Sequence, residues 1–290
     1  MRSALFVPAD SERKLKKALT SGADCLFVDL EDSVALDNKA EARAIASGFL
    51  HENAGKEGPG IFVRVNALDT GMTGDDLAAV MPHAPHGIVL PKSNHGHDVT
   101  ELDTHLRVHE AEHGLADGST KIVAIVTETA IGVLQASTYG RASRRLVAMA
   151  WGAEDLSADL GALERRNADG TYRDVFRFAR LQTLLGAVAA GVQPLDTVYP
   201  DFRDQTGFRT ECEQAAIDGF TGKMAIHPAQ VAIINAVFTP SDEAVGKAQA
   251  IVDAFTAAGN AGVISLDGEM LDRPHLRKAQ NLLARVEALG

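Results

Sequence analysis

Short runs of consecutive apolar residues recur along the chain and are separated by longer stretches with helical spacing. The runs are rich in Val, Ile, Leu and Phe, which is typical of strands buried on both faces of a parallel sheet. Eight such strands are expected, at Ser3–Val7, Cys25–Val28, Ile61–Asn66, Gly87–Leu90, Lys121–Thr127, Arg145–Gly152, Leu195–Tyr199 and Gly222–Ile226. Strands that alternate with helices in this way predict an α/β fold.

Two architectures fit this periodicity, a closed (β/α)8 barrel and an open doubly wound sheet. An open sheet gathers its functional groups at one switch point, whereas a barrel collects them around its whole rim. Polar residues lie at or just after the carboxyl end of nearly every expected strand, at Asp10, Glu31, Asp32, Arg64, Asn66, Lys92, Glu128, Asp155, Asp201 and His227. We therefore favour a (β/α)8 TIM barrel over residues 1–240.

The pattern changes towards the C-terminus, and residues 241–290 are expected to form a C-terminal helical appendage. The segment 261–273 is Gly-rich and irregular, with alternating apolar positions, and a terminal helix covers 274–289. The apolar residues of this extension must be buried somewhere, because exposed apolar surface is unfavourable. They pack either on their own barrel or on a neighbouring subunit.

Composition restricts the class of protein. The chain has 290 residues, 46% of them hydrophobic, and a net charge of -11. Without clustered Lys and Arg, nucleic-acid binding is not expected. No apolar run is long enough to span a membrane, and the two cysteines have no metal-type spacing, so we expect a soluble protein of the cytoplasm.

Two acidic residues follow neighbouring expected strands, Glu128 after the fifth and Asp155 after the sixth. Carboxylates on neighbouring strand ends are able to converge on one cation, and hard oxygen ligands suit Mg²⁺ or Mn²⁺ rather than zinc. The alternative is that each acid caps the helix that follows it.

Two basic residues occur at other strand ends. Arg64 lies between Val63 and Val65, so alternation turns its side chain away from theirs, towards the barrel interior or mouth. There it clamps a substrate carboxylate with its planar fork, or holds loops through a salt bridge to Glu31 or Asp32. Lys92 is either a surface lysine or a contact for a phosphate or thioester oxygen.

Histidines are concentrated between residues 83 and 113. His105, His109 and His113 follow one another at intervals of four residues, which places them on one face of an expected helix. That stripe is either a transition-metal site or a solvated helix face. Glu110 and Glu112 beside it favour the solvated face.

Seven short motifs occur together and in order: Arg2–Pro8, Ala23–Val34, Val63–Asn66, Leu90–Lys92, Thr127–Thr129, Trp151–Leu156 and Ala225–Pro228. On these motifs the chain resembles the citrate lyase β-subunit-like family, the acyl-CoA lyases of the HpcH/HpaI aldolase group. The resemblance covers essentially the whole chain and implies a Mg²⁺-dependent barrel enzyme.

The resemblance also implies roles for individual residues. Glu128 and Asp155 match the metal ligands, and Arg64 matches the arginine that contacts the substrate's carboxylate and thioester end. Glu31 and Asp32 match acids that surround water at the metal. These matches lie within the motifs quoted above.

The tail resembles the family's segment ending Met-Ile-Asp. Asp272 matches an acid/base carboxylate that one subunit donates to its neighbour's site, so a homo-oligomer, a trimer or hexamer, is implied. Glu269 stands where many relatives have lysine. That difference bears on the contact with CoA or an acyl carrier more than on the chemistry.

The expected function is an oxo-acid-lyase that cleaves a 3-hydroxy-3-carboxyacyl thioester of the malyl-, citramalyl- or citryl-CoA type. Retro-Claisen cleavage gives acetyl-CoA, or a homologue, and a 2-oxo acid. Metal and arginine stabilise the charge that develops, and Asp272 protonates the enolate. The alternatives are an aldolase of free 2-oxo acids without CoA and a non-catalytic subunit of a citrate lyase-like complex.

Overall fold

The structure is a computed structural model that describes residues 1–259 and 261–289. It divides into two compact units, Met1–Asn235 and Ala236–Gly290. Asn260 and Gly290, both within the expected extension, lie outside the described residues.

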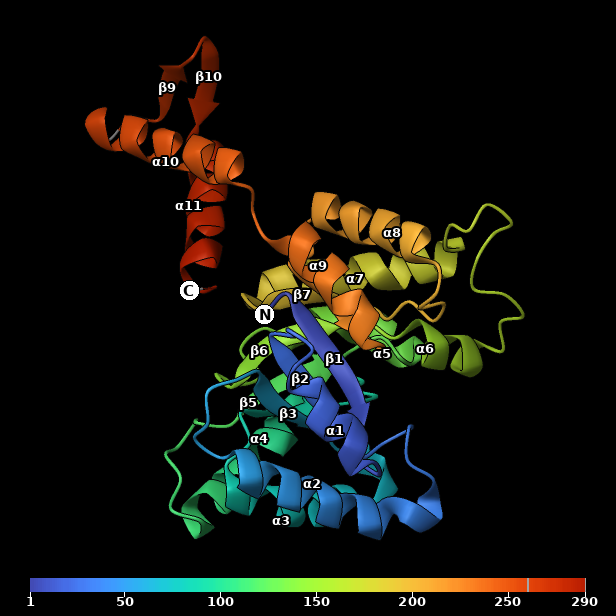
Figure 1. The fold of residues 1–290 in the computed structure, drawn as a ribbon. Coiled ribbons are helices and arrows are strands. Elements are labelled where there is room, and N and C mark those ends of the chain that lie inside the picture. The colour runs from blue at the N-terminus through green and yellow to red at the C-terminus, as the bar shows by residue number, and fades with distance from the viewer. Residues whose placement is uncertain (260, 290) are drawn as a thin grey trace. The chain divides into compact units, whose positions relative to one another are not determined.

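The first unit is a closed barrel of eight parallel strands in the order β1 to β8, so the predicted (β/α)8 fold is confirmed (Figure 1). The strands are β1 Ser3–Pro8, β2 Cys25–Asp29, β3 Gly60–Arg64, β4 Gly87–Leu90, β5 Lys121–Ile125, β6 Leu146–Ala150, β7 Gln193–Asp196 and β8 Gly222–Ala225. Closure pairs β1 with β8, with Leu5 opposite Ala225, and leaves the sheet without free edges.

Helices connect the strands, and all but α9 belong wholly to the first unit. They are α1 Glu12–Ala18, α2 Lys39–Asn53, α3 Thr73–Val80, α4 Gly96–Glu112, α5 Ala130–Gln135, α6 Ala153–Leu160, α7 Asp174–Ala190, α8 Gln205–Asp218 and α9 Pro228–Phe238. Short 3₁₀ turns lie at Leu36–Asn38, Leu68–Thr70, Met81–His83 and Ala136–Tyr139. Local sequence determines where helices begin and end. The side chain of Thr129 caps the N-terminus of α5, and Gly191 ends α7 with φ 72°.

The barrel interior is apolar, with charge only towards its carboxyl end. Phe27 and Phe62 belong to one buried cluster that fills the space between the strands. Two positions further along each strand, on the same face, come Asp29 and Arg64. The alternation that buries the phenylalanines therefore also turns these charged side chains inward, at the rim where TIM-barrel enzymes have their sites.

The seventh strand differs from its expected bounds. It was expected at Leu195–Tyr199, but Gln193 and Pro194 already pair with Ala148 and Met149 of β6. A proline has no backbone N–H and usually argues against a strand, which is why the sequence pattern places the start too late.

The second unit consists of α10 Asp242–Ala257, β9 Val263–Leu266, β10 Glu269–Asp272 and α11 Arg273–Glu287. A small core holds it together, formed by Ala248, Ile251, Phe255, Leu271 and Ala279. The prediction that 261–273 is irregular was wrong, because β9 and β10 form an antiparallel hairpin there.

The hairpin has a recognisable sequence signal. Asp267 and Gly268 form its turn with φ values of 51° and 82°. An Asp-Gly pair between alternating apolar residues favours a two-residue hairpin whose central residues both have positive φ. Among the residues that the structure describes, no helix is both long enough and apolar enough to cross a membrane.

Candidate active site at the carboxyl rim of the barrel

Arg64 and Asp29 form the base of the candidate site. They lie opposite each other in the register of β2 and β3. Nε and Nη2 of Arg64 each donate to a different oxygen of Asp29, both at 2.7 Å. A salt bridge of Arg64 to Glu31 or Asp32 was one of its two expected roles, and the bridge to Glu31 is present, whereas the pairing with Asp29 was not expected. The available signal was that both residues end adjacent strands on the same inward face.

A third contact from Arg64 reaches Glu31, with 2.9 Å between Nη1 and Oε2. Its guanidinium also lies 4.7 Å from the centre of the Phe6 ring. Burial acts to raise the pKa of Asp29, but the adjacent charge of Arg64 outweighs it and lowers that pKa. Arg64 is thus a fixed cation, packed on an aromatic ring and held by two acids.

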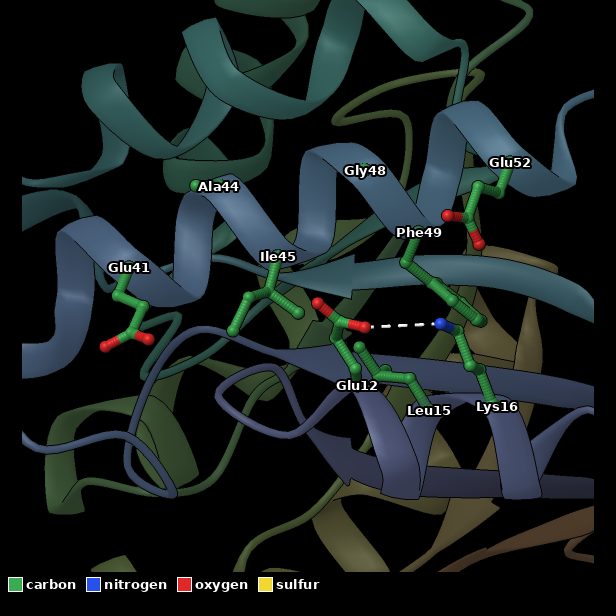
Figure 2. A pocket seen from close by; sticks show the side chains of 9 residues that line it. All are labelled: Glu12, Leu15, Lys16, Glu41, Ala44, Ile45, Gly48, Phe49 and Glu52. Carbon is green, nitrogen blue, oxygen red and sulfur yellow. Dashed lines mark hydrogen bonds and ion pairs between the residues drawn. The ribbon is translucent and has the colours of Figure 1, made fainter.

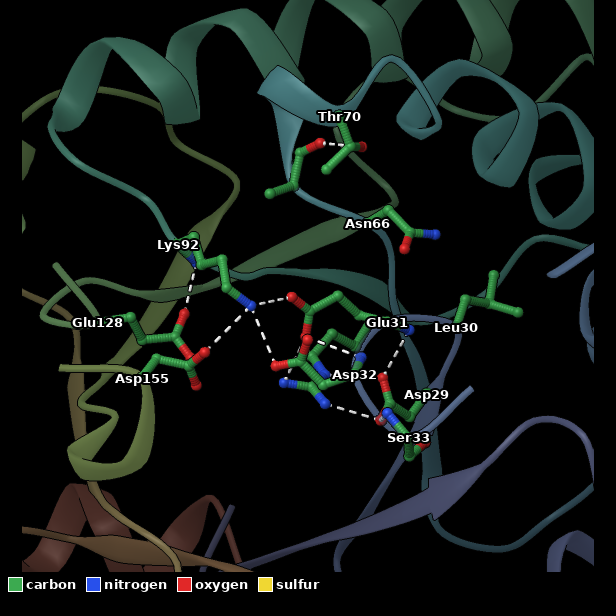
Figure 3. A network of polar contacts seen from close by, with 12 residues as sticks. Asp29, Leu30, Glu31, Asp32, Ser33, Asn66, Thr70, Lys92, Glu128 and Asp155 are labelled. Carbon is green, nitrogen blue, oxygen red and sulfur yellow. Dashed lines mark hydrogen bonds and ion pairs between the residues drawn. The ribbon is translucent and has the colours of Figure 1, made fainter. Parts of the chain in front are cut away.

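Lys92 links this pair to the expected metal ligands. Its ammonium contacts Glu31, lies 3.0 Å from Asp32 Oδ2 and 3.3 Å from Asp155 Oδ1 (Figure 3). Lys92 has φ 49°, a left-handed conformation that a side chain other than Gly adopts at a cost. Lys92 is therefore part of a rim network, and it is not a solvated surface lysine.

Glu128 is buried beside this network, with 3% of the residue exposed. Its Oε2 accepts a 2.5 Å hydrogen bond from the backbone N–H of Lys92. Gly152 lies against it so closely that a Cβ there would come within 2.6 Å of Glu128 Cγ. Glycine at position 152 is thus what leaves room for the carboxylate.

Neither expected metal ligand acts as a hydrogen-bonded helix cap. The Oγ1 of Thr129, not Glu128, accepts the N–H of Gly132 at the start of α5. Asp155 lies in the first turn of α6, whose N-cap residue Gly152 has no side chain to donate or accept. The neighbouring Glu154 forms an ion pair with Arg165 instead. The capping alternative therefore does not account for Glu128, whereas Asp155 does occupy the first turn of α6, where a negative charge is favourable.

The rim carries more acidic than basic side chains. The basic ones are Arg64 and Lys92, and the acidic ones are Asp29, Glu31, Asp32, Glu128 and Asp155. Burial and then the charge of Asp155 raise the pKa of Glu128 to about 8. The charge of Arg64 and the N–H of Lys92 act in the opposite direction but do not offset this rise in pKa, and a divalent cation held by Glu128 and Asp155 would add the missing positive charge. The all-oxygen donor pair fits Mg²⁺ or Mn²⁺.

Asp272 belongs to the second unit and lies at the N-terminus of α11. Its Oδ1 is 2.6 Å from Nδ1 of His275, and the backbone N–H of Asp272 donates to the same nitrogen at 3.2 Å. Glu269, in the same strand, is 3.5 Å from Lys247. The expected transfer of Asp272 to a neighbouring subunit's site stays a prediction.

A separate pocket of about 270 Å³ lies in the helical layer, between α1 and α2 (Figure 2). Leu15, Ile45 and Phe49 line it, and its charged residues include the ion pair of Glu12 with Lys16 at 3.2 Å. The i,i+4 spacing of that pair is common on exposed helices. This pocket has none of the converging buried charge found at the rim.

Comparison with known proteins decides the family. A sequence model described as HpcH/HpaI aldolase/citrate lyase matches residues 2–228. The chain belongs to this family. The resemblance seen in the sequence motifs is thereby confirmed.

Curated relatives match over the full length of this chain. Citrate lyase subunit beta of Escherichia coli (strain K12) is 35% identical over 291 aligned residues, covering 100% of this chain and 94% of the relative. A (3S)-malyl-CoA thioesterase of Cereibacter sphaeroides (strain KD131) is 36% identical, covering 100% of this chain and 95% of the relative. Both similarities include the C-terminal extension as well as the barrel.

A solved structure matches nearly the whole chain as well. It is the CitE protein of Mycobacterium tuberculosis in complex with magnesium, acetoacetate and coenzyme A. The TM-score is 0.77 at 32% identity, and the match covers 99% of this chain and 98% of the other.

Proposed function

We propose that this protein is a Mg²⁺-dependent acyl-CoA lyase that cleaves the carbon–carbon bond of a 3-hydroxy-3-carboxyacyl thioester. The observation that carries the proposal is the meeting of Glu128, Asp155, Arg64 and Lys92 at the barrel rim. The products are a 2-oxo acid and acetyl-CoA or a close homologue. Relatives named for citrate lyase and for malyl-CoA chemistry support the substrate class.

The metal ligands in this proposal are Glu128 and Asp155. When bound, Mg²⁺ supplies a Lewis acid that favours negative charge on the substrate's 3-oxygen and its adjacent carboxylate. Glu128 is held by the N–H of Lys92 and confined by Gly152, so its oxygens are oriented before a cation arrives. Such a fixed ligand costs little reorganisation on binding.

Arg64 binds the thioester end of the substrate in this account. A guanidinium has five N–H donors, and three of the contacts of Arg64 go to Asp29 and Glu31. No partner among residues 1–259 and 261–289 takes the remaining donors, which in this proposal bind an anionic oxygen. Because Asp29 and Phe6 fix the guanidinium plane, these donors are positioned for the enolate oxygen that develops as the bond breaks.

The proton balance assigns a further role. Cleavage transfers the proton of the 3-hydroxyl to a carboxylate and leaves an electron pair on the α-carbon of the thioester, which then takes a proton back from the same group. We assign both proton transfers to Asp272, an acid/base carboxylate contributed by a neighbouring subunit, so catalysis requires a homo-oligomer, a trimer or hexamer.

The direct test is a substrate screen with the isolated full-length chain. Malyl-, citramalyl- and citryl-CoA are each supplied with Mg²⁺, and the matching free acids serve as controls. The proposal expects a 2-oxo acid to form from at least one CoA ester and from none of the free acids. Cleavage of a free acid would instead identify an aldolase that needs no CoA. If the chain were inactive on every ester and gained activity only when partner subunits were added, it would be a subunit of a citrate lyase-like complex.

A second candidate function is hydrolysis of the thioester, which the (3S)-malyl-CoA thioesterase relative favours. Hydrolysis releases free CoA thiol without breaking a carbon–carbon bond. A thiol-reactive dye and a 2-oxo acid assay on the same reaction separate the two activities. Thiol without 2-oxo acid would favour the thioesterase, and 2-oxo acid without thiol favours the lyase.

A further inference from the structure

The last turn of α4 brings together three side chains that the rim chemistry does not use. They are His109, Glu112 and His113, and one possible ligand atom from each lies within 4.8 Å of the others. The rings of His109 and His113 are stacked, with centres 6.2 Å apart and planes 6° from parallel. Nδ1 of His109 lies 3.6 Å from Oε2 of Glu112.

This triad lies away from the rim. The C-terminus of α4 leads towards β5, which begins at Lys121, and so faces the amino end of the barrel strands. Glu128 comes after the carboxyl end of the same strand. The two groups of ligands are thus separated by the length of β5, and the α4 triad is a different location from the proposed Mg²⁺ site.

Two features of the triad point to a cation. Nδ1 of His109 is buried and has no hydrogen-bond partner among the residues that the structure describes. A buried nitrogen with a lone pair or an N–H and no partner is unfavourable, and coordination removes that cost. The C-terminus of a helix also carries partial negative charge, which favours a cation beside His113 at the C-cap of α4.

The sequence from His109 to His113 has the His-Glu-x-x-His spacing of zinc hydrolases, in which the glutamate is the general base. In this chain the corresponding glutamate, Glu110, is bound to an arginine. Both oxygens of Glu110 accept hydrogen bonds from Arg145, at 2.6 and 2.7 Å, and the residue is 1% exposed. Glu110 therefore has no access to water at the triad, so the arrangement suits metal binding without hydrolysis.

We propose that His109, Glu112 and His113 form a binding site for a transition-metal ion of the Zn²⁺ class. Two imidazoles and one carboxylate match the donors that Zn²⁺ takes, whereas Mg²⁺ prefers oxygen ligands alone. All three ligands come from one helical turn, so the bound ion fastens the end of α4. The fourth coordination position faces solvent, because Glu112 and His113 are exposed.

The experiment measures zinc content of the full-length protein after equilibrium dialysis against Zn²⁺ with Mg²⁺ in large excess, which keeps the rim site filled. His113→Gln and His109→Gln are compared with His97→Gln, an exposed histidine in the first turn of the same helix. About one Zn²⁺ per chain is expected in the wild type and the control. Both ligand variants should lose affinity by more than about tenfold.

A thermal melt provides a second readout. Zn²⁺ should raise the melting temperature of the wild type and of His97→Gln, and should leave that of His113→Gln unchanged. Equal zinc content in the wild type and both ligand variants would overturn the site, as would equal zinc-dependent shifts. Because all three substitutions lie near or on the surface, circular dichroism of the metal-free variants checks that each one folds.

Discussion

Gly152 lies so close to the side chain of Glu128 that no residue with a Cβ would fit at position 152 without a shift. A Cβ at Gly152 would also come within 3.0 Å of Oε1 of Glu128, so it would displace the carboxylate that we assign to the metal. The backbone N–H of Lys92 holds the other oxygen of that carboxylate. The position of this proposed ligand therefore depends on the absence of one methyl group.

Gly152→Ala is expected to weaken Mg²⁺ binding and to reduce turnover by about tenfold or more, because a misplaced ligand loses its coordination geometry. Gly140→Ala is the matched control, since a Cβ there meets no atom within 4 Å. Mg²⁺ titrations of activity compare the two variants. An unchanged Mg²⁺ requirement in Gly152→Ala would contradict the assignment of Glu128.

Arg64→Lys keeps the charge but loses the planar fork that bonds both oxygens of Asp29. Turnover should fall by about a hundredfold or more if the remaining donors of Arg64 bind substrate. Arg43→Lys provides the control, because Arg43 makes a comparable 2.7 Å bond to Asp76 between α2 and α3. If Arg64→Lys behaved like the control, with a lower melting temperature and normal turnover, Arg64 would be structural.

The sequence was sufficient to predict the inward direction of Arg64 but not its partners. Alternation along a strand decides which face a side chain takes, and Val63 and Val65 made that pattern clear. The pairing of Asp29 with Arg64 depends on the register between two strands, which no local pattern reveals. The contact of Gly152 with Glu128 likewise depends on how β5 and β6 lie together.

Strands β7 and β8 carry a second buried pair, Asp196 and Lys223, which are opposite each other in register. Nζ of Lys223 lies 2.8 Å from Asp196 Oδ2, and Arg180 also contacts this acid. Burial acts to raise the pKa of Asp196, but Lys223 and Arg180 outweigh it and lower that pKa to about 2. This pair joins the last two strands before the barrel closes on β1.

Asp196→Asn removes the carboxylate that Lys223 and Arg180 share, and leaves Lys223 with Glu211 at 2.9 Å as its remaining acidic partner. The loss of one buried partner should destabilise the protein by about 3 kcal/mol near neutral pH. A lowered pKa means that the stabilisation is present above the ordinary value of 3.8 and is lost as the pH falls towards about 2. Urea unfolding at several pH values tests this. The difference between wild type and variant should shrink in acid, and a constant difference would contradict the ion-pair account.

Among the elements, long regular patterns were predicted well and short irregular ones were not. The terminal helix was expected over 274–289 and is α11, Arg273–Glu287. The start of strand β7 was predicted two residues too late, because a proline such as Pro194 usually argues against a strand. The β9–β10 hairpin was missed although Asp267 and Gly268 signalled it, because each strand is only four residues long.

For the whole molecule, the central question is whether one chain completes the site of another. Two inactive variants, Asp272→Ala and Glu128→Ala, are mixed under conditions that allow subunit exchange. If neighbours donate Asp272, about a quarter of the sites in an equal mixture combine an intact Glu128 with an intact Asp272. Activity should recover to about that fraction of the wild type.

Native mass spectrometry of the mixture verifies that subunits exchange. No recovery despite exchange would mean that Asp272 acts within its own chain or has no role in catalysis. A matched mixture of Arg64→Ala with Glu128→Ala should stay inactive. Arg64 and Glu128 belong to the barrel of one chain, so every barrel in this mixture lacks one of the two residues.

The most direct measurement of the proposed function follows both products of one reaction, with wild type and Glu128→Gln side by side. With a malyl-, citramalyl- or citryl-CoA substrate and Mg²⁺, wild type should form the 2-oxo acid and the shortened acyl-CoA in equal amounts. A chelator should stop the reaction, and Glu128→Gln should be inactive at every Mg²⁺ concentration while it remains folded. Release of free CoA without 2-oxo acid, or normal cleavage by Glu128→Gln, would contradict a Mg²⁺-dependent lyase that binds its metal at Glu128.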